Sequence, residues 1–164
     1  PRDYATVKQI NSLIQAMPFE SEVEKRNKVL VSLLFLTGAR ISALISLKIK
    51  HVDLNLKSIN QHPKEVKTKN RKRIKTYFFP VGHLACDVMI DYSRFLIQTK
   101  PMSKNDPLFP RNLPGEPPLS ETMLGITEWK STTSARKIIT GEFEKNGLPG
   151  YCPHSFRNSL TQLA

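Results

Sequence analysis

The first residue whose position suggests a role in binding or catalysis is an arginine that follows a glycine turn. The apolar run of residues 29–36 ends at Thr37 and Gly38, Arg40 follows, and apolar residues then return at helical spacing. This pattern predicts a buried helix, a turn, and a second helix with Arg40 in its first turn. Backbone N–H groups and a partial positive charge at that turn, together with a guanidinium, suit the binding of an anion, above all a phosphate. The alternative is a surface arginine beside a capping glycine.

A second pair of side chains stands near the end of the chain, in the segment Pro-His-Ser-Phe-Arg. His154 and Arg157 are three residues apart, so they share a face if the segment is helical. A histidine can donate a hydrogen bond to a phosphate or move a proton near neutral pH. The alternative for His154 is a residue that caps a helix after Pro153. Arg157 on the same face favours the functional interpretation.

Taken in order, these motifs resemble those of the tyrosine recombinase (phage integrase) family. That family has one catalytic arginine in a Thr-Gly-x-Arg turn between helices and another in a His-x-x-Arg motif near the C-terminus. Between them it has a lysine on a β-hairpin, and this chain has a strongly basic segment there, residues 64–75. The resemblance spans most of the chain. It implies site-specific DNA recombination or integration, in which a strand is cleaved and rejoined through a 3′-phosphotyrosine intermediate.

The resemblance also implies a role for each matching residue. Arg40 and Arg157 would bind the non-bridging oxygens of the scissile phosphate and neutralise the charge of a pentavalent transition state. His154 would donate a hydrogen bond to the same phosphate or assist proton transfer. The family's hairpin lysine protonates the leaving 5′ oxygen, and Lys69, next to the predicted hairpin tip at residues 70–71, is the first candidate for that general acid.

The other basic residues of the segment leave alternatives open. Lys67 and then Lys72 are the next candidates for the general acid. Lys67, Arg71, Lys72 and Arg73 are the expected DNA-binding residues. The alternative is a solvated basic hairpin that only contacts backbone phosphates, and for most of these charges that interpretation holds.

The chain departs from the family pattern in two places. The family usually has an acidic residue three positions after its first arginine, and here that position is Ala43. The family's tyrosine nucleophile and its second His or Trp lie after the His-x-x-Arg helix, so we expect them beyond Ala164. The tyrosines within the chain all precede His154: Tyr4, Tyr77, Tyr92 and Tyr151. We therefore expect residues 1–164 to be an integrase-type catalytic domain that is incomplete at its C-terminus and inactive in cleavage by itself.

The charge of the chain points to a polyanionic partner. There are 25 Lys and Arg against 14 Asp and Glu, a net charge of +11. Such an excess favours nucleic acid first and an anionic membrane second. The apolar run of residues 29–36 is far too short to cross a bilayer. We expect duplex DNA at recombination sites as the partner, and self-association of the full-length protein as a tetramer on that DNA.

Cysteine usage gives no sign of a metal site. Cys86 and Cys152 form no Cys-x-x-Cys pattern, and two thiols do not make a disulfide framework. We expect a cytoplasmic, nucleoid-associated bacterial protein with reduced thiols that needs no cofactor and no metal.

Periodicity predicts an α+β fold, mainly helical with a small three-stranded antiparallel sheet. Residues 65–68 and 73–79 are predicted strands, and residues 51–59 are predicted to form a strand or a turn followed by a strand. Residues 101–118 are rich in proline and are predicted as a loop, anchored by Leu108, Phe109 and Leu113, and residues 119–129 are ambiguous. The predicted helices are residues 6–17, 21–36, 40–48, 83–98, 133–146 and one that begins at His154.

Three other functions compete with a recombinase. A non-catalytic module that binds duplex DNA would keep the charge and the fold. A nuclease or RNA-binding enzyme built on His154 would need a metal cluster or a second base, and neither spacing is present. A type IB topoisomerase uses related chemistry, but nothing here resembles its larger framework.

Overall fold

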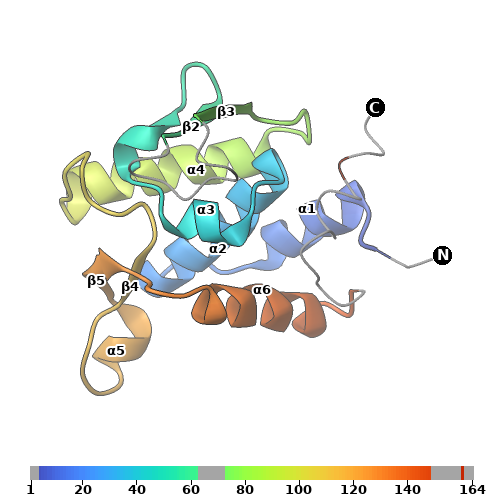
Figure 1. Ribbon diagram of the computed structural model, residues 1–164. Coiled ribbons are helices and arrows are strands. Elements are labelled where there is room, and N and C mark those ends of the chain that lie inside the picture. Colours follow the sequence, from blue (N-terminus) through green and yellow to red (C-terminus); the bar gives the residue numbers. More distant parts are fainter. Residues whose placement is uncertain (1–3, 63–72, 149–159, 161–164) are drawn as a thin grey trace.

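The structure is a computed structural model that describes residues 4–62, 73–148 and 160. Helices are the main regular structure, and two small antiparallel sheets lie at the edges (Figure 1). The helical elements are α1 (Val7–Ala16), α2 (Glu22–Thr37), α3 (Ile41–Ile45), the 3-10 turn η1 (Ile49–His51), α4 (Leu84–Arg94), the π-helical turn η3 (Phe95–Thr99), α5 (Leu119–Thr122) and α6 (Thr133–Lys145). The strands are β1 (Val52–Asp53), β2 (Ser58–Gln61), β3 (Ile74–Tyr77), β4 (Pro110–Asn112) and β5 (Leu124–Glu128). The predicted α+β class is confirmed.

Helix α2 is the centre of the hydrophobic core. All eight side chains of residues 29–36 are at most 2 % exposed, so the helix is surrounded on every side. It packs against α1, α4 and α6. Burying one large aliphatic side chain contributes about 1.5–3 kcal/mol, so the apolar side chains of this run contribute substantially to the stability of the fold.

The predicted capping boxes fix where α1 and α2 begin. Thr6 and Gln9 exchange side-chain and backbone hydrogen bonds, and Ser21 and Glu24 do the same. These reciprocal bonds satisfy N–H groups that the first turn of a helix leaves unpaired. Both predicted helix starts are therefore confirmed.

The three-stranded sheet is present, but its strands differ from the prediction. Residues 51–59 were expected to form a strand or a turn followed by a strand, and they form the end of η1, then β1, a turn and the start of β2. A turn divides them, because the Asp53 carboxylate accepts the N–H groups of Asn55 and Leu56, and Lys57 has a positive φ of 53°. Strand β2 then pairs with β3 from Ser58↔Tyr77 to Gln61↔Ile74. The predicted strand at residues 65–68 lies outside the described residues.

A second sheet has its first strand in the predicted loop and its second strand in the segment that the sequence leaves ambiguous. Strands β4 and β5 pair antiparallel, and α5 lies between them in the chain (Figure 1). Leu108 and Phe109 are fully buried, so these two predicted anchors are confirmed, while Leu113 is half-buried. The ribbon is tied to α2 because the Glu22 carboxylate accepts both the Leu124 N–H, at 2.9 Å, and the Lys100 ammonium, at 2.8 Å.

Helix α6 is the last complete element of the described residues. Ile139 and Phe143 are buried, as predicted, and Ile138 is half-buried. Gly147 follows the helix with a φ of 65°, the left-handed conformation expected of a residue that ends a helix. The predicted helix from His154 lies outside the described residues except for Leu160, which is helical and buried in the core.

Candidate functional site

The turn that carries Arg40 is held by the backbone and by one threonine. Gly38 ends α2 with φ 61° and donates its N–H to the Leu34 carbonyl at 2.8 Å. The Thr37 hydroxyl donates to the Leu33 carbonyl and accepts the N–H of Ala39. These contacts fix the path of the chain into Arg40. Thr-Gly-Ala-Arg is therefore a rigid helix-to-helix turn, as the sequence predicts.

Arg40 is exposed at the start of α3. It is the residue before the first turn of the helix, with extended backbone angles, and α3 is shorter than predicted because it ends at Ile45. Among the described residues, no carboxylate pairs with its guanidinium. Ala43, at the position of the family's acidic residue, is 3 % exposed. Arg40 thus faces solvent as a cation available to an external anion, without support from position 43.

The three-stranded sheet is bonded directly to this turn. The Phe79 N–H donates to the Leu36 carbonyl at 2.7 Å, and the Phe78 N–H donates to the Lys57 carbonyl at 2.8 Å. At the other end of the ladder, Gln61 and Ile74 are the last pair, and residues 62–73 connect them. The predicted lysine segment therefore joins one end of the sheet, and the opposite end of the sheet is hydrogen-bonded to the turn that leads into Arg40.

Of the residues in that basic segment that were predicted to be catalytic or to bind DNA, Arg73 alone is described. It is exposed and stands directly before β3. Lys69, the predicted general acid, lies outside the described residues, as do Lys67, Arg71 and Lys72.

His154 and Arg157 also lie outside the described residues, between two anchored positions. On one side, Leu148 is half-buried against the core and its N–H donates to the Phe143 carbonyl at 3.0 Å. On the other side, Leu160 is 4 % exposed in the core. Helix α6 itself contacts α3, the helix that begins after Arg40. The described elements on both sides of the His-x-x-Arg segment therefore pack into the core that also carries the arginine turn.

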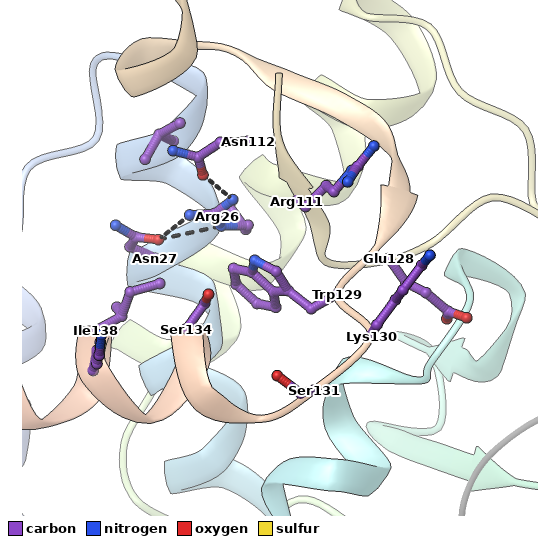
Figure 2. A pocket seen from close by; sticks show the side chains of 12 residues that line it. Arg26, Asn27, Arg111, Asn112, Glu128, Trp129, Lys130, Ser131, Ser134 and Ile138 are labelled. Atoms are coloured by element: carbon purple, nitrogen blue, oxygen red, sulfur yellow. Dashed lines mark hydrogen bonds between the residues drawn. The ribbon is translucent and has the colours of Figure 1, made fainter. Parts of the chain in front are cut away.

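A feature that the sequence analysis missed is a buried arginine on α2. Arg26 is 1 % exposed, and its guanidinium donates to Asn27 Oδ1, to the Pro110 carbonyl at 3.0 Å and to Asn112 Oδ1 at 2.6 Å. Its charged carbon lies 4.4 Å from the ring centre of Trp129 (Figure 2). Burial lowers the pKa of Arg26 to about 10, so it is still a cation at neutral pH. Its spacing from Val23, Leu30 and Leu33 places it on the buried face of α2, and that spacing was the available signal.

Arg26 and Trp129 form part of the wall of a cavity of about 670 Å³, which we call the Trp129 pocket (Figure 2). Its sides come from the N-terminal part of α2, the β4–β5 ribbon and the first turns of α6. The exposed side chains around it include Arg111, Lys130 and Lys137. Arg40 does not line this pocket.

Neither a metal site nor a membrane-spanning helix is found in residues 4–62, 73–148 and 160. No group of three or more His, Cys, Asp or Glu side chains there is placed to hold a metal ion. None of the helices in that part of the chain has the length and apolar character needed to cross a membrane.

Comparisons with known proteins agree with this geometry. Over residues 4–164, the chain matches the model of the family described as "Phage integrase family". It is 30 % identical over 153 residues to tyrosine recombinase XerC of Staphylococcus epidermidis, covering 93 % of this chain and 44 % of that protein. It is 26 % identical over 158 residues to tyrosine recombinase XerC of Halalkalibacterium halodurans, covering 93 % of this chain and 45 % of that protein. The chain thus spans somewhat less than half the length of these relatives.

A solved structure shares the fold. The crystal structure of XerA recombinase superposes with a TM-score of 0.69 at 20 % sequence identity, covering 99 % of this chain and 50 % of that one. The family match extends over nearly the whole chain and includes both arginine motifs. The chain therefore belongs to the phage integrase family of tyrosine recombinases.

Proposed function

We propose that the chain is the phosphate-binding part of a tyrosine recombinase that cleaves and rejoins duplex DNA at specific sites. The observation that carries this proposal is Arg40: an exposed cation, without a carboxylate partner among the described residues, on a turn fixed by Thr37 and Gly38. An arginine held in this way can bind two oxygens of one phosphate through parallel hydrogen bonds. Membership of the phage integrase family supports the assignment.

The proposed chemistry is an attack on a phosphodiester. A tyrosine hydroxyl gives up its proton, with His154 as the candidate to assist that transfer, and attacks phosphorus. A 3′-phosphotyrosine forms, the bond from phosphorus to the 5′ oxygen breaks, and that oxygen leaves with a proton from the general acid. Arg40 and Arg157 would bind the non-bridging oxygens, where negative charge develops, and His154 would donate to the same phosphate. One preorganised donor of this kind contributes about 3–4 kcal/mol to lowering the barrier. Lys69 would protonate the leaving oxygen, with Lys67 and Lys72 as the alternatives.

Two of the described tyrosines, Tyr92 and Tyr77, do not fit the place of the nucleophile. Tyr92 is fully buried, its hydroxyl donates to the Leu108 carbonyl at 2.8 Å, and burial raises its pKa well above the ordinary value. It can neither reach DNA nor ionise near neutral pH. Tyr77 is 59 % exposed on β3, but it precedes the His-x-x-Arg segment, unlike the family's nucleophile. We therefore propose that residues 1–164 bind DNA but do not cleave it alone. From the resemblance to the family we also propose that the full-length protein self-associates on DNA.

The direct test is a suicide DNA substrate, which traps the covalent intermediate. The full-length recombinase should give a protein–DNA adduct on a denaturing gel, and residues 1–164 should give none. An adduct mapped to Tyr4, Tyr77, Tyr92 or Tyr151 would overturn the placement of the nucleophile. No adduct from the full-length protein, together with ordinary DNA binding, would favour the alternative of a non-catalytic duplex-binding module.

A further inference from the structure

The Trp129 pocket carries an excess of positive charge. Of its lining residues, Arg26, Arg111, Lys130 and Lys137 are cations and Glu128 is the carboxylate, which gives 4 − 1 = +3. Arg111, Lys130 and Lys137 are all exposed at its rim. Among the described residues, none of these three forms an ion pair. The rim is therefore able to bind an anion without first breaking an internal contact.

The wall of the pocket is also cationic, and it is rigid. Arg26 is 1 % exposed, and its described hydrogen-bond acceptors are neutral oxygens, so its charge is not cancelled locally. In a poorly solvated site such a charge acts on a nearby anion more strongly than a surface charge does. The guanidinium lies against Trp129, which is half-buried, and so fixes a flat apolar surface beside the cations.

Helix α6 adds polar groups at the same rim. Ser131 and Ser134 line the pocket beside Lys130, and Figure 2 shows them next to the Trp129 ring. The residue before α6, Thr132, makes no side-chain hydrogen bond to the first turn, so backbone N–H groups there have no cap. Hydroxyl and N–H donors beside lysines form a surface that suits phosphate oxygens.

The position of α6 relates the pocket to the proposed DNA site. Helix α6 packs against α3, which begins directly after Arg40 (Figure 1). With 13 residues, α6 is about 20 Å long. One turn of duplex DNA covers about 34 Å. One turn of a duplex held at Arg40 is therefore longer than α6, so the same duplex is long enough to extend from Arg40 to the pocket at the first turns of this helix.

We propose that the Trp129 pocket binds a phosphate of the DNA backbone, at a nucleotide other than the one held at Arg40. Lys130 and Lys137 supply the charge, Arg111 closes the opposite side, and Trp129 packs against the sugar. This inference rests on the proposed function, since it takes duplex DNA as the partner. A free nucleotide carries the same phosphate chemistry, and the experiment below separates the two sources.

Trp129 makes the pocket directly observable, because it is the one tryptophan of the chain. The chain is titrated with unlabelled duplex DNA while tryptophan emission is recorded, and the anisotropy of a labelled duplex is measured in parallel. Emission and anisotropy should change with the same midpoint. Normal anisotropy with unchanged emission would overturn the proposal while leaving DNA binding, and so the proposed function, intact. Failure of the anisotropy to change would overturn both.

Charge-matched variants supply the second test. The double variant Lys130→Gln, Lys137→Gln should bind duplex DNA about eightfold more weakly per lost contact at 0.1 M salt, with a log–log salt slope smaller by about 0.9 per contact. The control Lys8→Gln, Arg94→Gln removes the same charge from α1 and α4, which do not line this pocket, and should bind like the wild type. An equal loss in both variants would show a general charge effect and overturn the proposal.

Two further measurements test how the charge of the pocket affects duplex binding and whether the bound phosphate belongs to DNA or to a free nucleotide. Glu128→Gln removes the carboxylate from the lining and should tighten duplex binding, and a weakening would contradict the proposal. Deoxythymidine monophosphate should leave Trp129 emission unchanged at concentrations where the duplex saturates it. Saturation by the mononucleotide without a response to duplex would assign the pocket to free nucleotides instead.

Discussion

The backbone N–H of Phe79 donates a 2.7 Å hydrogen bond to the carbonyl of Leu36, one residue before the end of α2. This bond joins the three-stranded sheet to the turn at Gly38, which leads into Arg40. The two parts of the chain that the family uses for its first arginine and its lysine are therefore connected through main chain. Their relative position depends on backbone geometry at the end of α2 more than on any side chain.

The first prediction concerns that backbone geometry. Gly38 has φ 61°, which an L-residue adopts only with strain, so Gly38→Ala should lower the free energy of unfolding by about 1–2 kcal/mol. Urea denaturation measures this change. The matched control is Gly141→Ala in the middle of α6, where an added Cβ meets nothing within 4 Å. That substitution should stabilise the chain by up to about 1 kcal/mol. Equal effects of the two substitutions would contradict the conformation assigned to Gly38.

The second prediction concerns the buried cation of α2. Arg26→Met should destabilise the chain by about 2–4 kcal/mol, because the Pro110 carbonyl and the Asn112 amide lose charge-assisted donors in a buried site. Arg26→Lys keeps the charge but not the planar fork of donors, so it should fall between Met and the wild type. Arg136→Met on the exposed face of α6 is the control and should change stability by less than about 0.5 kcal/mol. Thermal or urea unfolding distinguishes these values.

The third prediction is a pH dependence with a defined sign. Burial raises the pKa of Tyr92, so the folded state keeps the phenolic proton above pH 10, where the unfolded chain releases it. Stability from this group is therefore complete below pH 10 and is lost as the pH rises further. Tyr92→Phe should cost about 1 kcal/mol at pH 7, since the bond to Leu108 is lost. That difference from the wild type should shrink above pH 10, and a difference that grows there would contradict the assigned shift.

Much of the helical fold could be predicted from the sequence because its signals are local. The pairs Thr6–Gln9 and Ser21–Glu24 mark helix starts through bonds between near neighbours, and Gly38 ends α2 through its own φ. The strands were harder to predict from the sequence. Residues 51–59 alternate like one strand, but the Asp53 carboxylate binds two N–H groups and turns the chain. Strands β4 and β5 depend on contacts with Glu22 and Lys100, which lie far away in sequence.

Of the predicted catalytic residues, Arg40 is the one that lies within the described part of the chain. Arg40 stood out because a turn and a charge coincide within four residues, and the structure places it exposed on that turn. Arg26 did not stand out, since a cation among charged neighbours at the start of a helix suggests a solvated face. Its helical spacing from Leu30 and Leu33 was a local signal of burial. Its hydrogen-bond partners Pro110 and Asn112 lie about eighty-five positions away, and no local pattern encodes those contacts.

The fourth prediction concerns the general acid. In the full-length recombinase, Lys69→Ala should block strand cleavage of ordinary DNA. A substrate with sulfur at the bridging 5′ position has a leaving group that needs no proton, so it should restore cleavage by this variant. The same substrate should not restore cleavage by Arg40→Ala or Arg157→Ala, because these residues are proposed to act on the non-bridging oxygens. Rescue of Lys67→Ala or Lys72→Ala instead would move the general acid to that lysine.

The measurement that tests the central claim most directly is cleavage by Arg40→Ala on two substrates. On ordinary DNA the variant should cleave about a hundred- to a thousand-fold more slowly than the wild type, while the dissociation constant for duplex DNA changes little. A scissile methylphosphonate lacks the negative charge that Arg40 is proposed to neutralise, so it should remove most of the difference in rate. A loss of DNA binding that matches the loss of cleavage, or no rescue by the neutral substrate, would contradict the role of Arg40 at the scissile phosphate.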